Sequence, residues 1–131
     1  MKKINKFVVS ALKSKGKDSD VAKYINTIST SETWEDAFKA LSGKPDFGFK
    51  NAYLFEKSVV SKIKHICGDS THLDKIVDTV SDKDKATFKL LSDAGYSDLF
   101  EVANHFDILS GVKGIGPKKI DFISNYLDNF F

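Results

Sequence analysis

The stretch "LSGVKGIGPKKIDFI", Leu109–Ile123, holds three glycines and one proline within seven consecutive residues, and apolar runs flank it on both sides. Glycine tolerates a positive φ and the close approach of another backbone, and proline suits the first position of a helix. We therefore predict a sharp turn at Gly114–Gly116, with Ile115 pinned in the core, followed by a helix that starts at Pro117. The predicted buried stripe of that helix consists of Ile120, Ile123, Leu127 and Phe130.

The remainder of the chain also shows helical spacing of its apolar residues, with no alternating run long enough for a strand. Serine, aspartate and glycine interrupt the pattern where helices are expected to start and stop. The predicted helix starts include Ser19 or Asp20, Ser31, Ser70, Ser81 with Asp84, and Ser97. The predicted helices cover about residues 4–16, 19–28, 31–41, 49–66, 70–80, 81–95 and a segment from 97 onward. The predicted fold is therefore all-α, a single globular domain over residues 1–131 with seven or eight short helices.

Charge is distributed unevenly along the chain, although the formal net charge is only +2. Residues 1–17 carry six lysines and no acid, and all 20 basic residues of the chain are lysines. Lysine acts on phosphate as a point charge, whereas arginine is the side chain that reads guanine through paired hydrogen bonds. A nucleic-acid partner would therefore be held by its backbone. For the N-terminal lysine cluster, the alternatives are a solvated helix face, an arm that contacts a nucleic-acid backbone, and a membrane-surface helix.

The single cysteine, Cys67, excludes an intramolecular disulfide framework and is compatible with a reducing compartment. His65 and His72 lie near it, but a closed zinc site needs a fourth ligand and more regular spacing. No stretch approaches the length of a membrane span, and the apolar run near the N-terminus is too short and too interrupted for a signal peptide. We expect a cytoplasmic protein without a membrane partner.

At "GVKGIGPKK", residues 111–119, the chain resembles the helix-hairpin-helix motif of flap endonucleases, polymerase beta and DNA glycosylases. The resemblance covers about 20 of the 131 residues. It departs from the family at Ile120, where those proteins usually carry a small residue for close helix packing. In that family the hairpin grips the phosphate backbone through main-chain N–H groups and does not read sequence. The resemblance implies a DNA-binding site made of Lys113, Gly114, Ile115, Gly116, Lys118 and Lys119.

The same resemblance implies a partner and a class of function. The partner would be duplex or branched DNA, bound without sequence preference by an accessory protein of DNA repair, replication or recombination, or of a mobile element. Some members of the family also hold a monovalent cation, K+ or Na+, through hairpin carbonyls, here those of Ser110, Val112 and Ile115. No other cofactor is implied.

The first alternative is a protein-protein interaction module, an inhibitor or adaptor, that keeps the hairpin fold. Such a module would use an apolar face in place of the lysines. Its candidate anchors are Trp34 and the terminal Phe130 and Phe131, because aromatic side chains contribute strongly at protein interfaces.

A second copy of the hairpin lies earlier in the chain, at Leu41–Phe55, "LSGKPDFGFKNAYLF". At an offset of 68 residues, its Leu-Ser-Gly, its second hairpin glycine and one lysine coincide with those of residues 109–123. We therefore predict an internal repeat of residues 1–66 and 67–131, with hairpins at 41–55 and 109–123.

The first copy is degraded. Asp46 stands where the first hairpin glycine should be, and its carboxylate would repel a phosphate. We expect this copy to serve mainly as a packing partner, and Lys44 and Lys50 are its candidate contacts to DNA.

A glycosylase or lyase activity is the second alternative, because Lys118 occupies the position at which bifunctional DNA glycosylases of this class carry their Schiff-base lysine. That chemistry also uses an aspartate further along the chain, and no aspartate matches it before Phe131. Lys50 and Asp69 have a suitable spacing, but a continuous helix over 49–66 would hold them roughly 25 Å apart or more. The sequence predicts no catalytic residue and leaves enzymatic activity open.

Overall fold

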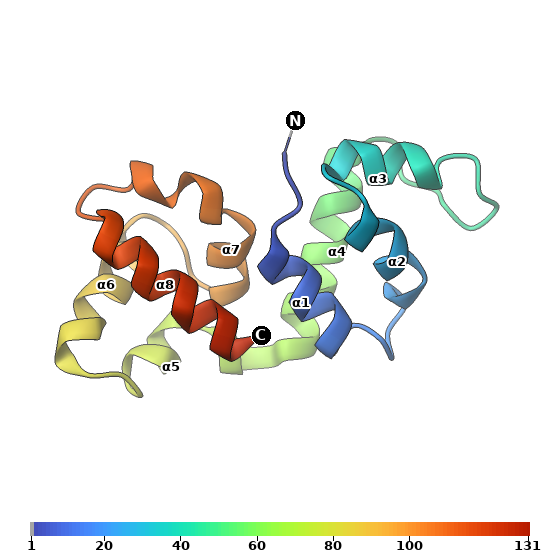
Figure 1. Ribbon diagram of the computed structural model, residues 1–131. Coiled ribbons are helices and arrows are strands. Elements are labelled where there is room, and N and C mark those ends of the chain that lie inside the picture. The colour runs from blue at the N-terminus through green and yellow to red at the C-terminus, as the bar shows by residue number, and fades with distance from the viewer. Residues whose placement is uncertain (1) are drawn as a thin grey trace. The chain divides into compact units, whose positions relative to one another are not determined.

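The computed structural model describes residues 2–131, and within them the chain forms eight α-helices and two short 3-10 helices (Figure 1). The extended pairing in these residues is limited to isolated bridges. The predicted fold class, all-α with short helices, is confirmed. The α-helices are α1 (Lys6–Lys15), α2 (Ala22–Thr30), α3 (Trp34–Leu41), α4 (Ala52–Cys67), α5 (Leu73–Val77), α6 (Asp82–Asp93), α7 (Leu99–Asn104) and α8 (Pro117–Phe130), and the 3-10 helices are η1 (Gly68–Thr71) and η2 (Phe106–Gly111).

Contacts between residues divide the chain into two compact units, unit 1 (Met1–Ile66) and unit 2 (Cys67–Phe131). Unit 1 contains α1 to α3 and all but the last residue of α4, and unit 2 contains η1, α5 to α7, η2 and α8. The division falls at the boundary predicted for the internal repeat. The longest helix of each unit comes last in it, α4 with 16 residues and α8 with 14.

The two units share an order of elements. In unit 1 an isolated antiparallel bridge joins Lys3 to Thr33, and in unit 2 another joins His72 to Asp98. Thr33 caps α3 and Asp98 caps α7, and these are the third α-helices of their units. This common layout supports a repeat of the two halves, which stays a prediction.

The cap of α7 is a buried carboxylate. Asp98 is 1% exposed and accepts a hydrogen bond from the Phe100 N–H at 2.7 Å. Its other oxygen accepts the hydroxyl of Thr71, which is fully buried at the end of η1. Ser97, the expected start of this helix, instead accepts the Leu73 N–H through its carbonyl at 3.1 Å. These bonds join η1 and the first residue of α5 to the start of α7, the helix that leads into η2.

Two helix starts in unit 1 differ from the prediction because serine hydroxyls can bond to the backbone at either end of a helix. Ser31, the expected cap of the third helix, ends α2, and Thr33 caps α3 by accepting the Asp36 N–H at 3.1 Å. Ser19, an expected cap of the second helix, accepts the Val21 N–H at 3.3 Å, ahead of the first turn of α2. The helices exist as predicted, and their caps lie elsewhere.

The long helix predicted over residues 49–66 is α4, which starts at Ala52. The later start has a local cause, because the Asn51 side chain accepts the Leu54 N–H at 2.9 Å and caps the first turn. From Ala52 to Cys67 the helix is continuous, as the absence of glycine and proline in this range predicted.

The helix predicted over residues 70–80 is divided into η1 and α5. His72 separates them, and its backbone is extended, with φ −66° and ψ 133°, where it pairs with Asp98. The next start agrees with the prediction. Ser81 accepts the Asp84 N–H at 3.4 Å, which is the first of the two bonds of a capping box, and its hydroxyl also donates to the Asp84 carboxylate at 3.0 Å.

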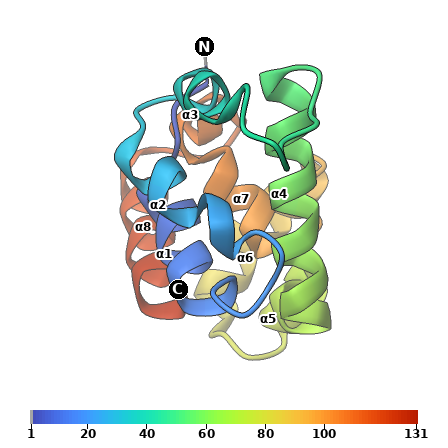
Figure 2. The same cartoon turned by 90° about the vertical axis from the view of Figure 1, so that its right-hand side faces the viewer.

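An aromatic cluster fills unit 1. Trp34 is 1% exposed and packs edge-on against Phe55, with ring centroids 5.8 Å apart. Phe55 also contacts Phe47 at 5.1 Å and Tyr24 at 5.4 Å. The loop between α3 and α4, which can be followed in Figures 1 and 2, contributes Phe47 to this cluster. The expectation that Trp34 could anchor a protein partner is therefore wrong, because the indole lies in the core.

Candidate nucleic-acid interface

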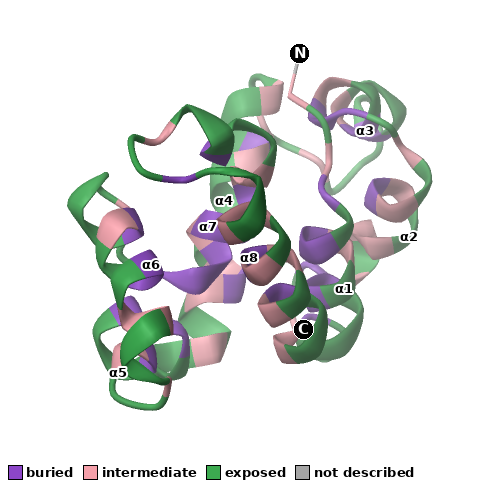
Figure 3. Ribbon diagram, turned by 60° about the vertical axis from the view of Figure 1, so that its left-hand side comes forward, coloured by how far each residue is buried: buried purple, intermediate pink, exposed green. Residues whose placement is uncertain are grey.

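The predicted hairpin of residues 109–123 lies in unit 2 and joins η2 to α8. Leu109 is fully buried and Ile115 is 5% exposed, so apolar side chains anchor the turn on both sides. The Ile115 N–H donates to the Val112 carbonyl at 3.0 Å and closes the turn. Figure 3 shows the segment before α8 as largely exposed, apart from a short buried stretch. The element before the turn is a 3-10 helix of six residues, shorter and tighter than an α-helix.

Gly114 is required by the fold. Its φ of +90° lies in the region that L side chains rarely adopt. A Cβ atom at this position would also lie 3.1 Å and 3.2 Å from the two terminal methyl carbons of Leu90 in α6. The sequence predicted the turn, but it carried no signal for Leu90, which lies far away along the chain and meets Gly114 only in the folded unit.

Gly116 is not required by the fold. Its backbone has φ −102° and ψ −175°, an extended conformation open to any residue. An added Cβ atom would have no neighbouring atom within 4 Å. Packing therefore does not require a glycine at position 116, and the space beside Gly116 at the start of α8 is open.

The start of α8 exposes free backbone donors. Gly116 supplies no side-chain cap, and Pro117 at the first helical position has no N–H. The N–H groups of Lys118 and Lys119 have no acceptor within the helix, because the first turn of an α-helix lacks preceding carbonyls. They carry the positive end of the helix dipole. This end of α8 is therefore suited to an anion.

The three predicted lysines of the hairpin have two different roles. Lys113 and Lys118 are exposed and flank the turn on either side. The Lys119 ammonium instead donates to the Gly114 carbonyl at 3.0 Å, which ties the first turn of α8 back to the hairpin. Lys113 and Lys118 thus supply free charge, and Lys119 supplies charge while it also holds the turn.

The predicted monovalent-cation site would use the carbonyls of Ser110, Val112 and Ile115. The Val112 carbonyl accepts the Ile115 N–H, and the neighbouring Gly114 carbonyl accepts the Lys119 ammonium. A positive group therefore already contacts a hairpin carbonyl. Over residues 2–131, no cluster of three or more His, Cys, Asp or Glu side chains could hold a metal ion. Binding of K+ or Na+ at the carbonyls stays a prediction.

The predicted first hairpin, at residues 41–55, does not have the backbone of the second. Asp46 takes the place of Gly114, and no non-glycine residue in the described part of the chain has a positive φ. The helix that follows is capped by Asn51, whereas α8 has no side-chain cap. Lys44 and Lys50 are exposed on this loop of unit 1, without an uncapped helix start beside them. The expected structural role of this copy agrees with its contribution of Phe47 to the aromatic cluster.

The glycosylase alternative gains no geometric support from Lys50 and Asp69. The helix between them, α4, is continuous over 16 residues. At a rise of 1.5 Å per residue it is about 24 Å long, with Lys50 before its start and Asp69 after its end. Lys118, the other candidate for Schiff-base chemistry, lies exposed in the first turn of α8.

The two hairpin glycines are expected to respond oppositely to alanine. Gly114→Ala should destabilise the protein by about 1–2 kcal/mol, because it forces an L side chain to positive φ. Gly116→Ala should change the free energy of unfolding by less than about 0.5 kcal/mol, because its backbone is relaxed and its surroundings are open. Urea unfolding followed by circular dichroism measures both changes, and equal losses from both variants would contradict this account of the turn.

Comparisons with known proteins return no relative that could identify the chain. No protein-family profile matches it, and neither a curated protein nor a solved structure matches it. None of the helices in residues 2–131 is both long and apolar enough to cross a membrane.

Proposed function

We propose that this protein binds DNA through its phosphate backbone, with the hairpin Lys113–Lys119 as the contact surface. The observation that carries the proposal is the start of α8, where open space at Gly116, free backbone N–H groups and two exposed lysines occur together. A phosphate oxygen accepts hydrogen bonds from such N–H groups and is favoured by the helix dipole. A glycine at this point lets the phosphate come close to the backbone.

The contact is expected to be independent of DNA sequence. Backbone N–H groups and lysine ammonium groups complement phosphate oxygens, which are the same at every base pair. The chain contains neither arginine nor glutamine, two of the side chains that read base edges through paired hydrogen bonds. A protein of this kind would act as an accessory factor on duplex or branched DNA, in repair, replication or recombination or in a mobile element.

The salt dependence of binding tests this proposal. With about three phosphates contacted, the affinity for a labelled duplex should fall roughly 40-fold between about 50 and 200 mM salt. Two duplexes of unrelated sequence should bind equally well at each salt concentration. Fluorescence anisotropy measures both. Failure to bind duplex or branched DNA at low salt would overturn the proposal and favour a protein-interaction module.

Gly116→Ala gives a sharper test of the same surface. A methyl group at Gly116 would fill the space that a phosphate must enter, and the affinity for duplex DNA should fall about tenfold, close to 1.4 kcal/mol. Gly111→Ala is the matched control, because Gly111 also has no neighbour within 4 Å of an added Cβ and no positive φ. Affinities lowered equally by both substitutions would argue against a phosphate at the start of α8.

A further inference from the structure

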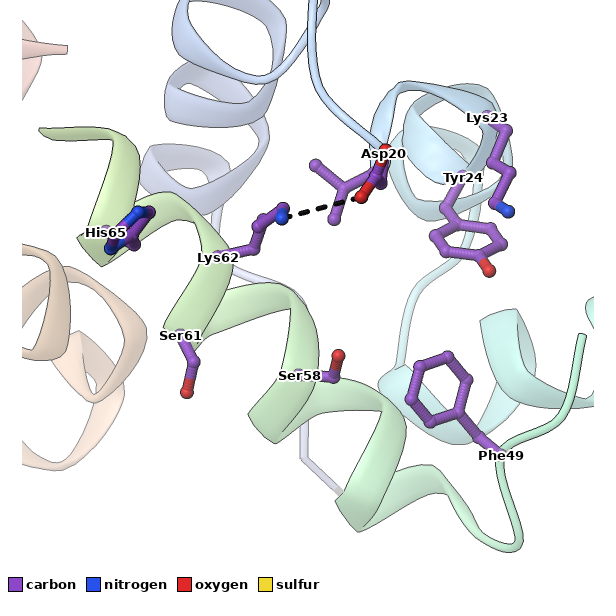
Figure 4. Close-up of a pocket in the computed structure, with 9 residues that line it drawn as sticks. Asp20, Lys23, Tyr24, Phe49, Ser58, Ser61, Lys62 and His65 are labelled. Atoms are coloured by element: carbon purple, nitrogen blue, oxygen red, sulfur yellow. Dashed lines mark ion pairs between the residues drawn. The ribbon is translucent and has the colours of Figure 1, made fainter.

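A groove in unit 1 lies between α2 with its preceding turn on one side and α4 on the other (Figure 4). Its volume is about 400 Å³, within the range of roughly 300–1,000 Å³ that is typical of small-molecule sites. In Figure 4, Ser58 and Lys62 project from α4 into the groove, and the rings of Tyr24 and Phe49 lie on its other side. The groove is lined by Asp20, Val21, Lys23, Tyr24, Phe49, Ser58, Ser61, Lys62 and His65.

The α4 wall of the groove is a stripe of polar side chains. Ser58, Ser61, Lys62 and His65 lie at helical spacing on one face. Within residues 2–131, the side chains of Ser58, Ser61 and His65 make no hydrogen bond. Serine hydroxyls in such positions commonly bond to a nearby carbonyl, as the Ser42 hydroxyl does with Phe38 at 2.8 Å. The stripe therefore leaves hydrogen-bonding groups free for a ligand.

The opposite wall is aromatic and held in place. Phe49 contacts Phe47 at 5.3 Å and Phe55 at 5.5 Å between ring centroids, and Tyr24 contacts the same two rings at 5.8 Å and 5.4 Å. Tyr24 and Phe49 are both half-buried, so that part of each ring remains accessible. Because the cluster fixes these rings before any ligand arrives, a planar ligand ring could stack on them with little loss of side-chain freedom.

Positive charge exceeds negative charge in the groove. Lys62 lies 3.5 Å from the Asp20 carboxylate, and both side chains are exposed, at 41% and 88%. Such an exposed ion pair is weak, so a phosphate could replace Asp20 as the partner of Lys62. Lys23 adds a second ammonium group, 5.3 Å from the centre of the Tyr24 ring.

From these features we propose that this groove binds a nucleotide unit, with the base against Tyr24 and Phe49 and the phosphate at Lys62, Ser58 and His65. The aromatic wall is complementary to a planar ring. The polar stripe and the excess positive charge are complementary to an anion that accepts several hydrogen bonds. A nucleoside monophosphate carries both. The unit is either a free nucleotide or one unpaired nucleotide of a single strand, since both present the same chemistry.

Titration of the full chain with dAMP tests the proposal by amide NMR shifts. The amides of Tyr24, Phe49, Ser58, Lys62 and His65 should shift and saturate, with an apparent Kd roughly tenfold lower than for deoxyadenosine or inorganic phosphate at equal ionic strength. A short single-stranded oligonucleotide as titrant separates the two sources. Tighter binding than dAMP indicates a strand, and weaker binding indicates a free nucleotide. Absence of saturable shifts with either, or equal affinity for phosphate alone, would overturn the proposal.

Lys62→Glu supplies the matched variant test. It replaces the phosphate partner on α4 by a carboxylate and should raise the apparent Kd for dAMP at least about tenfold. Lys57→Glu is the control, because Lys57 is exposed on the same helix but does not line the groove. Ser58→Asp gives an independent variant, since it adds a charge to the groove at an exposed position. Unchanged dAMP binding in both Lys62→Glu and Ser58→Asp would contradict the proposed phosphate position.

This inference stands apart from the duplex contact proposed for the hairpin. Lys62→Glu should lower the affinity for duplex DNA only slightly when measured by anisotropy, and Gly116→Ala should leave dAMP binding intact when measured by NMR. A protein that binds duplex DNA but not dAMP would refute the groove proposal alone. A protein that binds dAMP but no duplex would refute the hairpin proposal alone.

Discussion

Replacing Lys113 and Lys118 together by glutamate is expected to lower the affinity for duplex DNA by roughly 100-fold at moderate salt. Both side chains are exposed beside the uncapped start of α8, and neither makes a hydrogen bond or ion pair within residues 2–131. The substitution therefore removes two positive charges, adds two negative ones and leaves the packing of the turn unchanged. The slope of log affinity against log salt should also become shallower by about two. Anisotropy titrations over a series of salt concentrations measure both quantities.

The control for this experiment is a charge-matched double variant elsewhere in unit 2. Lys75→Glu with Lys83→Glu makes the same change in net charge on exposed residues of α5 and α6. This control should lower the affinity for duplex DNA only slightly, through the change in the overall electrostatic field of the protein. If both double variants lost the same affinity, the binding would depend on net charge and not on the hairpin. Lys119 is left unchanged in both, because its contact with Gly114 holds the turn.

Asp98→Ala is expected to lower the free energy of unfolding of the protein by about 3 kcal/mol. The carboxylate caps α7 through the Phe100 N–H and accepts the hydroxyl of Thr71, and both polar side chains are buried. Its removal leaves two buried donors without a partner, and that desolvation cost is larger than the ordinary value of one hydrogen bond. Urea unfolding followed by circular dichroism measures the loss.

Two further variants separate the buried network from simple helix capping. Ser81→Ala removes the exposed cap of α6 and should cost about 1 kcal/mol or less. Thr71→Val keeps the shape of the side chain but removes its hydroxyl, and it should cost about 2 kcal/mol, because Asp98 loses one of its two partners. In the Asp98→Ala background, Thr71→Val should cost much less. Additive losses would show that the two side chains do not act as one unit.

Much of the fold could be predicted because it depends on local chemistry. The helical period of the apolar residues gave the all-α class, and the absence of glycine and proline predicted the continuity of α4. Pro117 starts α8 and Ser81 caps α6 as expected. The errors lie at helix ends. Thr33 caps α3 in place of Ser31, and Asn51 caps α4, which therefore starts at Ala52 and not near Phe49. Several polar residues compete for such positions, and only packing selects among them.

The candidate hairpin shows the same limit on what local sequence can predict. Residues 111–119 were sufficient to predict a turn with Ile115 buried and lysines around it, and Ile115 is indeed 5% exposed. They did not distinguish the roles of the two glycines, nor those of Lys118 and Lys119. That distinction depends on the positive φ of Gly114, on the closeness of Leu90 to it, and on a contact between the Lys119 ammonium group and the Gly114 carbonyl.

The amino-acid order alone was therefore enough to specify the helices, the turn before α8 and the surplus of lysine around it, because each depends on residues within a few positions of one another. The folded structure alone decided that Gly114 lies against Leu90, that Asp98 joins Thr71, and that an aromatic groove forms in unit 1. The physical reason is the same in each case. These features bring together side chains that are distant along the chain, and their proximity comes from burial of the apolar faces and not from any local pattern.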